Sequence, residues 1–585
     1  MSIICGLENE NYKYVYGTIN DYEIPFSEEK QLSLTACRND WAAAQLLIYS
    51  ENSMVVCIND DTYFHNTENV DIIRVKIDIP GIDRKNVQAN LVGLVRDDDN
   101  QLKSDIILNQ PYIYVEPRKV QAVWIEATID SDQKPGKYDA VVTVYKHKMF
   151  DDEEVIKQLT FEIHVVDVLL KDPREYSFYL DLWQHNSNIA RKYDVELWSD
   201  RHFEIIERYI SALADLGQKA ISVIVSEIPW SGQLKFYDDR NYPSDLFEYS
   251  MVKVTLSENG KWNYDFSSLN RYIRLCFKYG IDKEIEVFGL INIWLSEKAG
   301  FGNIVEDYCD SIRIRYLDEK TGTYKFIRNK KDIYSYVHAL EKNFIESGWI
   351  DKVRVVADEP HDLELFRKRM AELKKMAPNF KYKAAIDKVS FMEEEIDGMN
   401  DYVPSLECVC SEFERLKNIR DSIDGKLLYY VSCIPDRPNT FICSPLLEAR
   451  LIPWLSWYFN LDGFLRWNFT VWPEKPLEKI SYRYPIWKAG DTNFVYPGKD
   501  GSPMLTLRYK NLKRGIRDYE IFKLFVEKED KDIMLDMLKN VFLWNDVSDL
   551  LPEKQKKPEE LYSLKYSDYD DLIEKIVVQL EDKIS

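Results

Sequence analysis

The sequence lacks the cysteine and histidine patterns that bind metal ions in proteins. Its nine Cys include no Cys-x-x-Cys pair, and Cys408 and Cys410 form only a Cys-x-Cys. The seven His are scattered along the chain and form no HExxH motif. Because metal sites need closely spaced ligands of these kinds, we expect no metal and no other cofactor.

The sequence also has no long apolar run. Its first residues, Met-Ser-Ile-Ile-Cys-Gly-Leu-Glu-Asn-Glu, lack the basic region and apolar stretch of a secretory signal. No segment approaches the roughly 20 apolar residues of a membrane span. Free thiols without a signal are typical of a reducing compartment. We therefore expect a cytoplasmic protein without membrane insertion, although a secreted protein whose signal had been removed would share these features.

Positive charge is scarce. The chain has 77 Lys and Arg against 99 Asp and Glu, which gives a formal net charge of −22. A charge of this sign repels the phosphates of nucleic acids and the surface of an anionic membrane. The sequence therefore argues against a protein that binds DNA or RNA.

Aromatic residues, in contrast, are abundant. They make up 13% of the chain and include 14 Trp and 38 Tyr. These side chains combine an apolar ring with a hydrogen-bonding edge, which suits contact with sugar rings. Most of them are nevertheless expected to fill the cores of a large protein.

With 585 residues, the chain is too long for one hydrophobic core, so several domains are expected. Residues 1–170 contain strand-like segments such as Ala-Val-Trp-Ile-Glu-Ala-Thr-Ile, separated by Asp, Asn, Gly and Pro. Several such strands without helical periodicity predict an N-terminal antiparallel β-sandwich.

From residue 171 to 489, strand-like and helical segments alternate, which indicates parallel βα units. Eight of them predict a (β/α)8 barrel, with its main insertions at 227–265 and 294–330. Residues 490–585 read as a hairpin followed by helices, and we expect this extension to pack on the barrel. The eight expected strands cover residues 177–183, 220–225, 285–291, 353–357, 382–386, 402–406, 427–431 and 463–467.

Two neighbouring acids, Asp358 and Glu359, end the fourth strand of this count, in the segment Val-Arg-Val-Val-Ala-Asp-Glu-Pro. Barrel enzymes keep their chemistry at the C-terminal ends of the strands. One acid that donates a proton beside one that stays ionised is the arrangement that glycoside hydrolysis needs. The alternative is structural, because an acid before Pro360 is also typical of a helix N-terminus.

Two glycosidase mechanisms are compatible with this pair. In a two-carboxylate retaining enzyme, Glu359 would be the acid/base and a nucleophile would lie about 5–5.5 Å away. Strand 7 is the usual source of that nucleophile, but its sequence has no acid before Asp436. In substrate-assisted catalysis, the acetamido oxygen of the sugar attacks C1 and forms an oxazolinium ion. Asp358 would then polarise the acetamido group and Glu359 would move the proton.

Four segments together resemble glycoside hydrolase family 123 and its wider relatives. They are Ala357-Asp-Glu-Pro360, Arg450 to Pro473, Gly490 to Gly498 and Leu507 to Glu520. The resemblance implies a sandwich followed by a (β/α)8 barrel. It also implies an exo-acting β-N-acetylgalactosaminidase that uses substrate-assisted catalysis on terminal β-linked GalNAc, with glycolipid glycans as substrates. A two-carboxylate glycosidase of another specificity and a non-catalytic carbohydrate-binding barrel are the alternatives.

The candidate sugar-binding residues lie at or just beyond strand ends. An indole can form the floor of a sugar site, Asn468 can bond a sugar hydroxyl, and the Tyr430 hydroxyl can bond the acetamido oxygen. A surface loop role is the alternative for Trp183 and His185, and helix capping is the alternative for Glu407. Core packing is the alternative for the others, which are Tyr430, Trp467, Asn468 and Trp472. The full set is Trp183, His185, Glu407, Tyr430, Trp467, Asn468 and Trp472.

Overall fold

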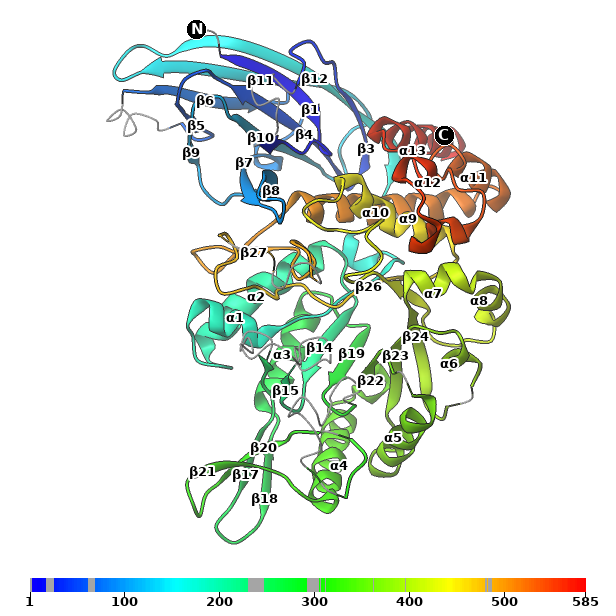
Figure 1. Cartoon of the computed structure of the whole chain (residues 1–585). Helices are drawn as coiled ribbons and strands as arrows, with labels where there is room; N and C mark the ends of the chain where they lie inside the picture. Colours follow the sequence, from blue (N-terminus) through cyan, green and yellow to red (C-terminus); the bar gives the residue numbers. More distant parts are fainter. Residues whose placement is uncertain are drawn as a thin grey trace.

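The computed structural model has three regions along the chain: a β-sandwich, an α/β region and a set of C-terminal helices (Figure 1). The sandwich and the C-terminal helices lie side by side at one end of the molecule, and the α/β region forms the other end. The structure describes residues 3–16, 26–60, 69–229, 247–291, 305, 307–310, 312–360, 362–394, 396–478, 481 and 487–584.

The sandwich consists of two six-stranded sheets, with strand orders β1-β4-β10-β7-β8-β2 and β3-β12-β11-β6-β5-β9. Apolar side chains from both sheets fill the space between them. The strands are β1 (Ile4–Asn9), β2 (Val15–Tyr16), β3 (Ser33–Arg38), β4 (Asp40–Tyr49), β5 (Met54–Cys57), β6 (Asp71–Asp78), β7 (Val87–Arg96), β8 (Leu102–Ile107), β9 (Tyr112–Val115), β10 (Val120–Ile129), β11 (Gly136–Lys148) and β12 (Glu154–Leu169).

The prediction of a purely antiparallel sandwich needs one correction. The second sheet is mixed, because β3 pairs with β12 and β5 pairs with β6 in parallel. Only Asn39 separates β3 from β4, and its φ of +58° lies in the left-handed region that Asn tolerates. The chain therefore passes directly from one sheet to the other there, and β3 lies at the edge of its sheet instead of forming a hairpin with β4.

The α/β region contains the eight expected strands, each close to its predicted position. Five form one parallel sheet in the order β14-β19-β22-β23-β24, and three form another in the order β13-β26-β25. The strands are β13 (Tyr179–Leu182), β14 (Ala220–Ile224), β19 (Glu284–Phe288), β22 (Val353–Asp358), β23 (Lys381–Ile386), β24 (Met399–Pro404), β25 (Leu428–Tyr430) and β26 (Gly463–Arg466).

A single closed barrel is therefore not confirmed. At the two seams, the pairing between the sheets is reduced to isolated parallel bridges, Leu180 with Gln218 at one and Tyr402 with Leu427 and Ser405 with Tyr430 at the other. Short strands at the seams, such as the three-residue β25, leave little length for a continuous ladder. The two sheets curl as two parts of a barrel.

Helices pack around these sheets, as the alternating pattern predicts. They bury apolar side chains against the sheets. They are α1 (Asn186–Tyr193), α2 (Asp200–Asp215), α3 (Ser267–Lys278), α4 (Lys330–Glu346), α5 (Leu363–Met376), α6 (Ser390–Glu393), α7 (Leu406–Ser411), α8 (Phe413–Arg420) and α9 (Leu446–Tyr458).

The two predicted insertions meet in space. Strand β17 (Lys253–Leu256) from the first insertion pairs in parallel with β20 (Arg315–Asp318) from the second. With β18 (Trp262–Asp265) and β21 (Thr323–Phe326) they form a four-stranded sheet in the order β18-β17-β20-β21. This small sheet projects from the end of the molecule opposite the sandwich (Figure 1). The first insertion also contains the short strands β15 (Ile228–Pro229) and β16 (Phe247–Glu248).

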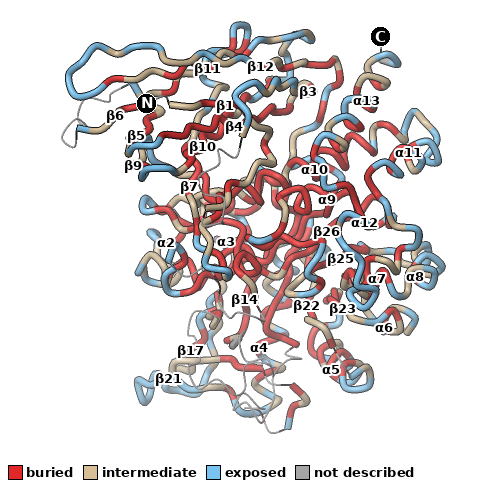
Figure 2. The backbone as a smooth tube through the Cα atoms, turned by 45° about the horizontal axis from the view of Figure 1, so that its top comes forward, coloured by how far each residue is buried: buried red, intermediate tan, exposed pale blue. Residues whose placement is uncertain are grey.

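The C-terminal region begins with a short hairpin and continues as helices. Figure 2 shows that α10, like α9, is buried along most of its length, because it lies against both the sandwich and the α/β region. The extension therefore packs on the sandwich as well as on the α/β region. Its elements are β27 (Tyr496–Pro497), β28 (Pro503–Met504), α10 (Leu507–Val526), α11 (Lys531–Leu538), α12 (Pro558–Leu561) and α13 (Tyr566–Ile584).

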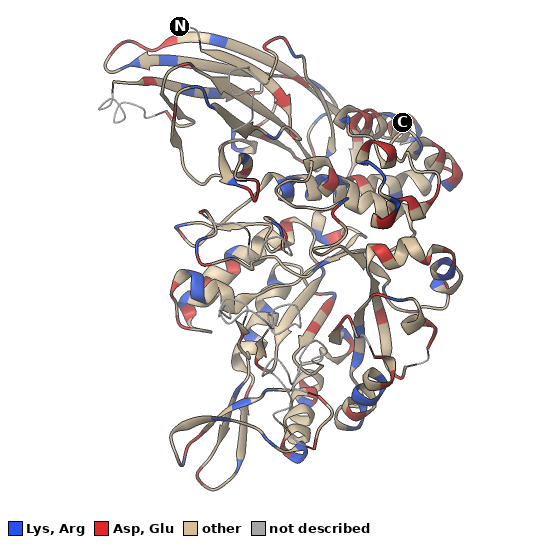
Figure 3. Cartoon of the chain, in the orientation of Figure 1, with Lys and Arg blue, Asp and Glu red and all other residues tan. Residues whose placement is uncertain are grey.

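Charged residues of both signs are interspersed over all three regions (Figure 3). Within the part of the chain that the structure describes, no helix is both long enough and apolar enough to cross a membrane.

Arg508 of α10 ties the sandwich to the α/β region. Its Nε and Nη2 donate to the two carboxylate oxygens of Asp105 in β8, at 2.9 and 3.0 Å. Its Nη1 donates to the carbonyls of Thr440, Gly490 and Asn493, which belong to loops of the α/β region and the extension. Both members of the ion pair are 1% exposed. A bidentate guanidinium–carboxylate pair with further acceptors can compensate for the loss of water at such a site.

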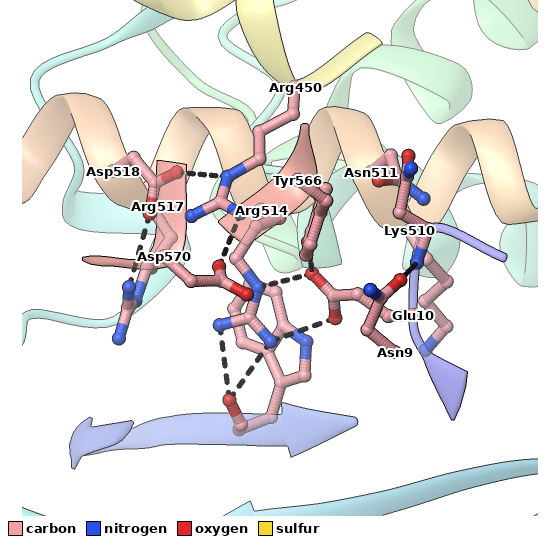
Figure 4. A network of polar contacts seen from close by, with 12 residues as sticks. Asn9, Glu10, Arg450, Lys510, Asn511, Arg514, Arg517, Asp518, Tyr566 and Asp570 are labelled. Atoms are coloured by element: carbon pink, nitrogen blue, oxygen red, sulfur yellow. Dashed lines mark hydrogen bonds and ion pairs between the residues drawn. The ribbon is translucent and has the colours of Figure 1, made fainter. Parts of the chain in front are cut away.

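Two further arginines of α10 reach other strands of the sandwich. Arg514 Nε donates to Glu10 at 2.8 Å, and Glu10 also accepts the hydroxyl of Tyr566 from α13 (Figure 4). Burial by itself would raise the pKa of Glu10, but Arg514 holds it below its ordinary value, so the carboxylate stays ionised. Arg517 makes a similar pair with Asp40 of β4. All three arginines of α10 therefore reach the sandwich.

We expect Arg508→Ala to lower the free energy of unfolding by about 3–5 kcal/mol, because it leaves Asp105 buried and without its cation. Arg118→Ala is the matched control. It removes the partner of Glu51 in a surface ion pair whose side chains are 52% and 47% exposed. It should lower the free energy of unfolding by less than about 1 kcal/mol. Urea unfolding followed by circular dichroism measures both. Equal losses in the two variants would contradict the role of Arg508.

Candidate active site

Side chains of β22 alternate between two sides of the sheet, as strand geometry requires. Val353, Val355 and Ala357 belong to the large apolar cluster that includes the surrounding helices. Val356 belongs to a separate, smaller cluster that receives a residue from each of the eight parallel strands. Asp358, two residues after Val356, therefore lies on the side of this inner cluster.

Glu359 would point the opposite way if the strand continued. Instead its φ is +43°, in the left-handed region, while its N–H still donates to the carbonyl of Ala385 at 3.0 Å. A residue other than Gly or Asn in this region costs on the order of 1–3 kcal/mol. As a result, Asp358 and Glu359 line the same pocket. The observed strain lies at the position where the sequence predicts a catalytic acid.

The helix-cap alternative does not apply to this pair. Helix α5 begins at Leu363, and its N-cap is Asp362, whose Oδ1 accepts the N–H of Leu365 at 2.9 Å. Neither Asp358 nor Glu359 caps the helix. His361 lies outside the described residues.

The pocket has a cavity volume of about 230 Å³ and lies at the C-terminal ends of the parallel strands. Four residues of the predicted binding set line it, and they come from strands 1, 7 and 8 and from the helix after strand 6. The lining residues are Trp183, Asp358, Glu359, Ala385, Asp387, Ser405, Glu407, Tyr430, Ser432, Cys433, Ile434, Leu465, Trp467 and Trp487.

Tyr430 of β25 donates its hydroxyl hydrogen to the Oε1 of Glu359. Burial, followed by the nearby Glu359 carboxylate, raises the pKa of Tyr430 well above its ordinary value. The phenol therefore stays protonated and remains a donor. The sequence predicts that this hydroxyl bonds the acetamido oxygen of a substrate, whereas in this structure it orients the carboxylate of Glu359.

Two further carboxylates line the pocket. Glu407 lies in the first turn of α7, and burial raises its pKa, with smaller contributions from Glu553 and Glu359. Asp387 directly follows β23 and is absent from the sequence-based set. The same reasoning that selects Asp358 could have found it, because Asp387 is the first residue after an expected strand.

The pocket is electronegative. Four of its lining residues are carboxylic acids, and none of the described lining residues is Lys, Arg or His. Such a lining stabilises positive charge as it develops at a reacting carbon and disfavours an anionic group. It therefore suits a neutral sugar that passes through an oxocarbenium-like transition state.

Three tryptophans form the aromatic part of the wall. Trp467 and Trp487 lie with ring centroids 5.0 Å apart and ring planes inclined by 47°. Trp183 packs edge-on against Phe288, with centroids 4.9 Å apart. Trp487 follows the eighth strand by some twenty residues, where no strand or helix pattern marks it, so sequence reasoning missed it.

The other three predicted residues do not line the pocket. His185 is 1% exposed, its ring lies edge-on to Trp467, and burial lowers its pKa to about 3, so it is neutral. Asn468 donates its side-chain N–H to the carbonyl of Asp491. Trp472 is fully buried and donates Nε1–H to the carbonyl of Val495 at 2.8 Å. Asn468 and Trp472 thus pack inside the protein, as their alternative predicts, and His185 is buried and does not lie on a surface loop.

A likeness to a solved structure extends over the whole chain. A family 123 glycoside hydrolase from Clostridium perfringens, described for glycolipid glycan hydrolysis, aligns with a TM-score of 0.73 and 20% identity over 100% of this chain and 98% of its own. This chain has the fold of that enzyme. A GH10 xylanase from termite gut and a β-D-glucuronidase from Dictyoglomus thermophilum each reach a TM-score of only 0.30 at 11% identity. They cover 68% and 82% of this chain and 90% and 66% of their own, and such likeness supports no further statement.

No curated protein sequence matches the chain. Two family models do match it. The glycoside hydrolase 123 catalytic domain covers residues 183–525, and the glycoside hydrolase 123 N-terminal domain covers residues 13–146. The pocket with Asp358 and Glu359 falls within the first of these. The chain belongs to glycoside hydrolase family 123.

Proposed function

We propose that this glycoside hydrolase removes terminal β-linked N-acetylgalactosamine from glycans, with retention, by substrate-assisted catalysis. The observation that supports this proposal most directly is that two adjacent carboxylates share one pocket because Glu359 adopts a left-handed conformation. We also propose glycolipid glycans as the substrates, in line with the description of the Clostridium perfringens enzyme.

In the first step, the acetamido oxygen attacks C1 and the bond from C1 to the leaving oxygen breaks. Glu359 donates its proton to that oxygen, and Asp358 accepts a hydrogen bond from the acetamido N–H as the oxazolinium charge forms. In the second step, Glu359 takes a proton from water, the water oxygen bonds to C1, and the oxazolinium ring opens. The hydroxyl of Tyr430 holds the Glu359 carboxylate in place for both transfers.

We infer that the two parallel sheets work as one (β/α)8 barrel around this pocket. The inner apolar cluster supports the inference because all eight strands contribute to it. The isolated bridges at both seams support it too. The members of the cluster on the strands are Tyr179, Ile224, Phe288, Val356, Ala385, Val403, Leu428, Tyr430 and Leu465.

A two-carboxylate retaining mechanism is the second candidate. Strand β25 provides no acid to the pocket, as the sequence indicates, but Asp387 and Glu407 reach it from β23 and α7. Either could act as a nucleophile opposite Glu359 if a sugar lay between them. This candidate requires a covalent glycosyl–enzyme intermediate, which substrate assistance does not form.

We expect Asp358→Asn and Glu359→Gln each to lower kcat/KM on an aryl β-GalNAc by roughly 10²–10⁴-fold, because each removes one of the two catalytic groups. Glu359→Gln should lower kcat/KM much less on a dinitrophenyl glycoside, because that leaving group needs no proton. Asp362→Asn is the control, because Asn can still cap α5. Sugar binding without turnover across GalNAc, GlcNAc, galactose and glucose aryl glycosides would instead identify a non-catalytic carbohydrate-binding protein.

Substrate analogues show which group attacks C1. We expect a GalNAc-thiazoline to inhibit, and an aryl galactoside with a 2-hydroxyl to react far more slowly than the acetamido sugar, because only the acetamido oxygen can close the ring. Asp387→Asn and Glu407→Gln should each lower kcat/KM less than the Asp358 and Glu359 variants do. Mass spectrometry after treatment with a 2-fluoro glycoside tests the second candidate. A covalent adduct on Asp387 or Glu407 would contradict substrate assistance and support the two-carboxylate mechanism.

We expect Tyr430→Phe to lower kcat by about 10–100-fold, which corresponds to the roughly 1.5–3 kcal/mol of a hydrogen bond to a charged group. Tyr429→Phe is the matched control on the same strand. Its hydroxyl points to the other side and donates to the carbonyl of Ile452 at 2.8 Å, so its loss should lower thermal stability and spare kcat. Steady-state kinetics and thermal unfolding of both variants separate the two effects. Similar kcat values in the two variants would rule out the role of Tyr430.

A further inference from the structure

The turn between β7 and β8 of the sandwich touches the segment that carries Trp487. Asp98 lies in this turn, and its Oδ2 accepts the backbone N–H of Ala489 at 2.7 Å. Ala489 is two residues after Trp487. A contact from the N-terminal region thus fixes the backbone next to a residue of the pocket wall.

A second hydrogen bond near Asp98 holds the backbone of the same tryptophan. Burial raises the pKa of Asp98, and the hydrogen bond from the N–H of Ala489 opposes that rise. The hydroxyl of Ser481, a residue next to Asp98, donates to the carbonyl of Trp487 at 3.0 Å. The backbone that follows the indole is therefore held at two atoms, the carbonyl of Trp487 and the N–H of Ala489.

Apolar packing supports these hydrogen bonds. Val95 and Ile106 of the sandwich form a buried cluster with Ile442, Ala489 and Tyr496. The N–H of Ile442 also donates to the carbonyl of Ala489 at 2.8 Å. Ala489 is consequently held by the sandwich through its N–H and by the loop before α9 through its carbonyl.

The ring of Trp487 reaches the pocket from this anchored segment. It lines the cavity together with Trp467, and its side chain is largely buried, so its place is set by its backbone and its neighbours. A small shift of this backbone would move the aromatic wall relative to Asp358 and Glu359. Misplacement by about 1 Å can reduce an enzyme's activity considerably.

We propose that Asp98 is a positioning residue of the active site, through which the β-sandwich sets the place of Trp487 in the sugar-binding pocket. The inference rests on the proposed function for the nature of the ligand. It gives the N-terminal sandwich a role in substrate binding, in addition to the roles of the catalytic pair.

Kinetics of two substitutions at one position test the proposal. We expect Asp98→Ala to raise KM for the aryl GalNAc glycoside by about tenfold and to change kcat by less than about threefold, because it removes a charge-assisted hydrogen bond that orders the wall. Asp98→Asn should restore KM, since the amide oxygen can accept the same N–H. The matched control is Asp99→Ala in the same turn, which removes an ion pair with Lys103 and a hydrogen bond from the N–H of Gln101 but no contact with Ala489.

A double-mutant cycle shows whether Asp98 acts through the tryptophan. In a Trp487→Leu background, Asp98→Ala should have almost no further effect on KM, because the group that it positions is gone. Additive effects would overturn the proposal. An increase in KM of the same size in Asp99→Ala would also overturn it, since the cause would then be general damage to the turn.

A readout that does not depend on turnover separates this proposal from the proposed function. With 5-fluorotryptophan incorporated, the ¹⁹F resonance of Trp487, identified by its loss in Trp487→Leu, should shift or broaden in Asp98→Ala and stay in place in Asp99→Ala and Asp98→Asn. If no glycoside is hydrolysed but this pattern appears, the proposed function fails and the positioning role of Asp98 stands. An unchanged resonance in Asp98→Ala would contradict the positioning role, whatever the activity.

Discussion

Neighbouring residues of a strand point to opposite sides, so two adjacent acids can share a pocket only where the backbone leaves the extended conformation. At the end of β22, the left-handed φ of Glu359 provides this departure, and the bond from its N–H to Ala385 keeps the turn against β23. The hydroxyl of Tyr430 then fixes the carboxylate that the turn has redirected. Every chemical role suggested for the pocket depends on this one local strain, because an extended Glu359 would point toward the helices.

Keeping such a strained turn requires rigid surroundings, and buried charge provides part of that rigidity. The arginines of α10 reach the sandwich and the α/β loops, and Glu10, the partner of Arg514, also accepts the hydroxyl of Tyr566 from α13. Buried polar contacts thus join the three regions. Buried ion pairs add little net stability, but they fix geometry, because each charge must keep its partner. The pocket wall that carries Trp487 lies within reach of this interface.

The sequence predicted the α/β elements well because each depends on local periodicity, which apolar stripes and strand ends make visible. Asp358 and Glu359 were found for the same reason, and Asp387 could have been found. Trp487 could not, because contacts with residues far away in the chain place it, and no local pattern records them. The parallel pairing of β3 with β12 and the incomplete ladders at the seams are also long-range features. Trp472 was misleading because a tryptophan beyond a strand end can serve the core as well as a ligand.

The charge of the pocket has a consequence for inhibitors. Four acidic side chains surround the cavity without a basic one among its described lining residues. The protein therefore offers a fixed negative field before any substrate arrives. An iminosugar that carries an ammonium group at the position of the anomeric centre would meet this field with its full charge. Sugars that bear sulfate or carboxylate groups would be repelled from the same place.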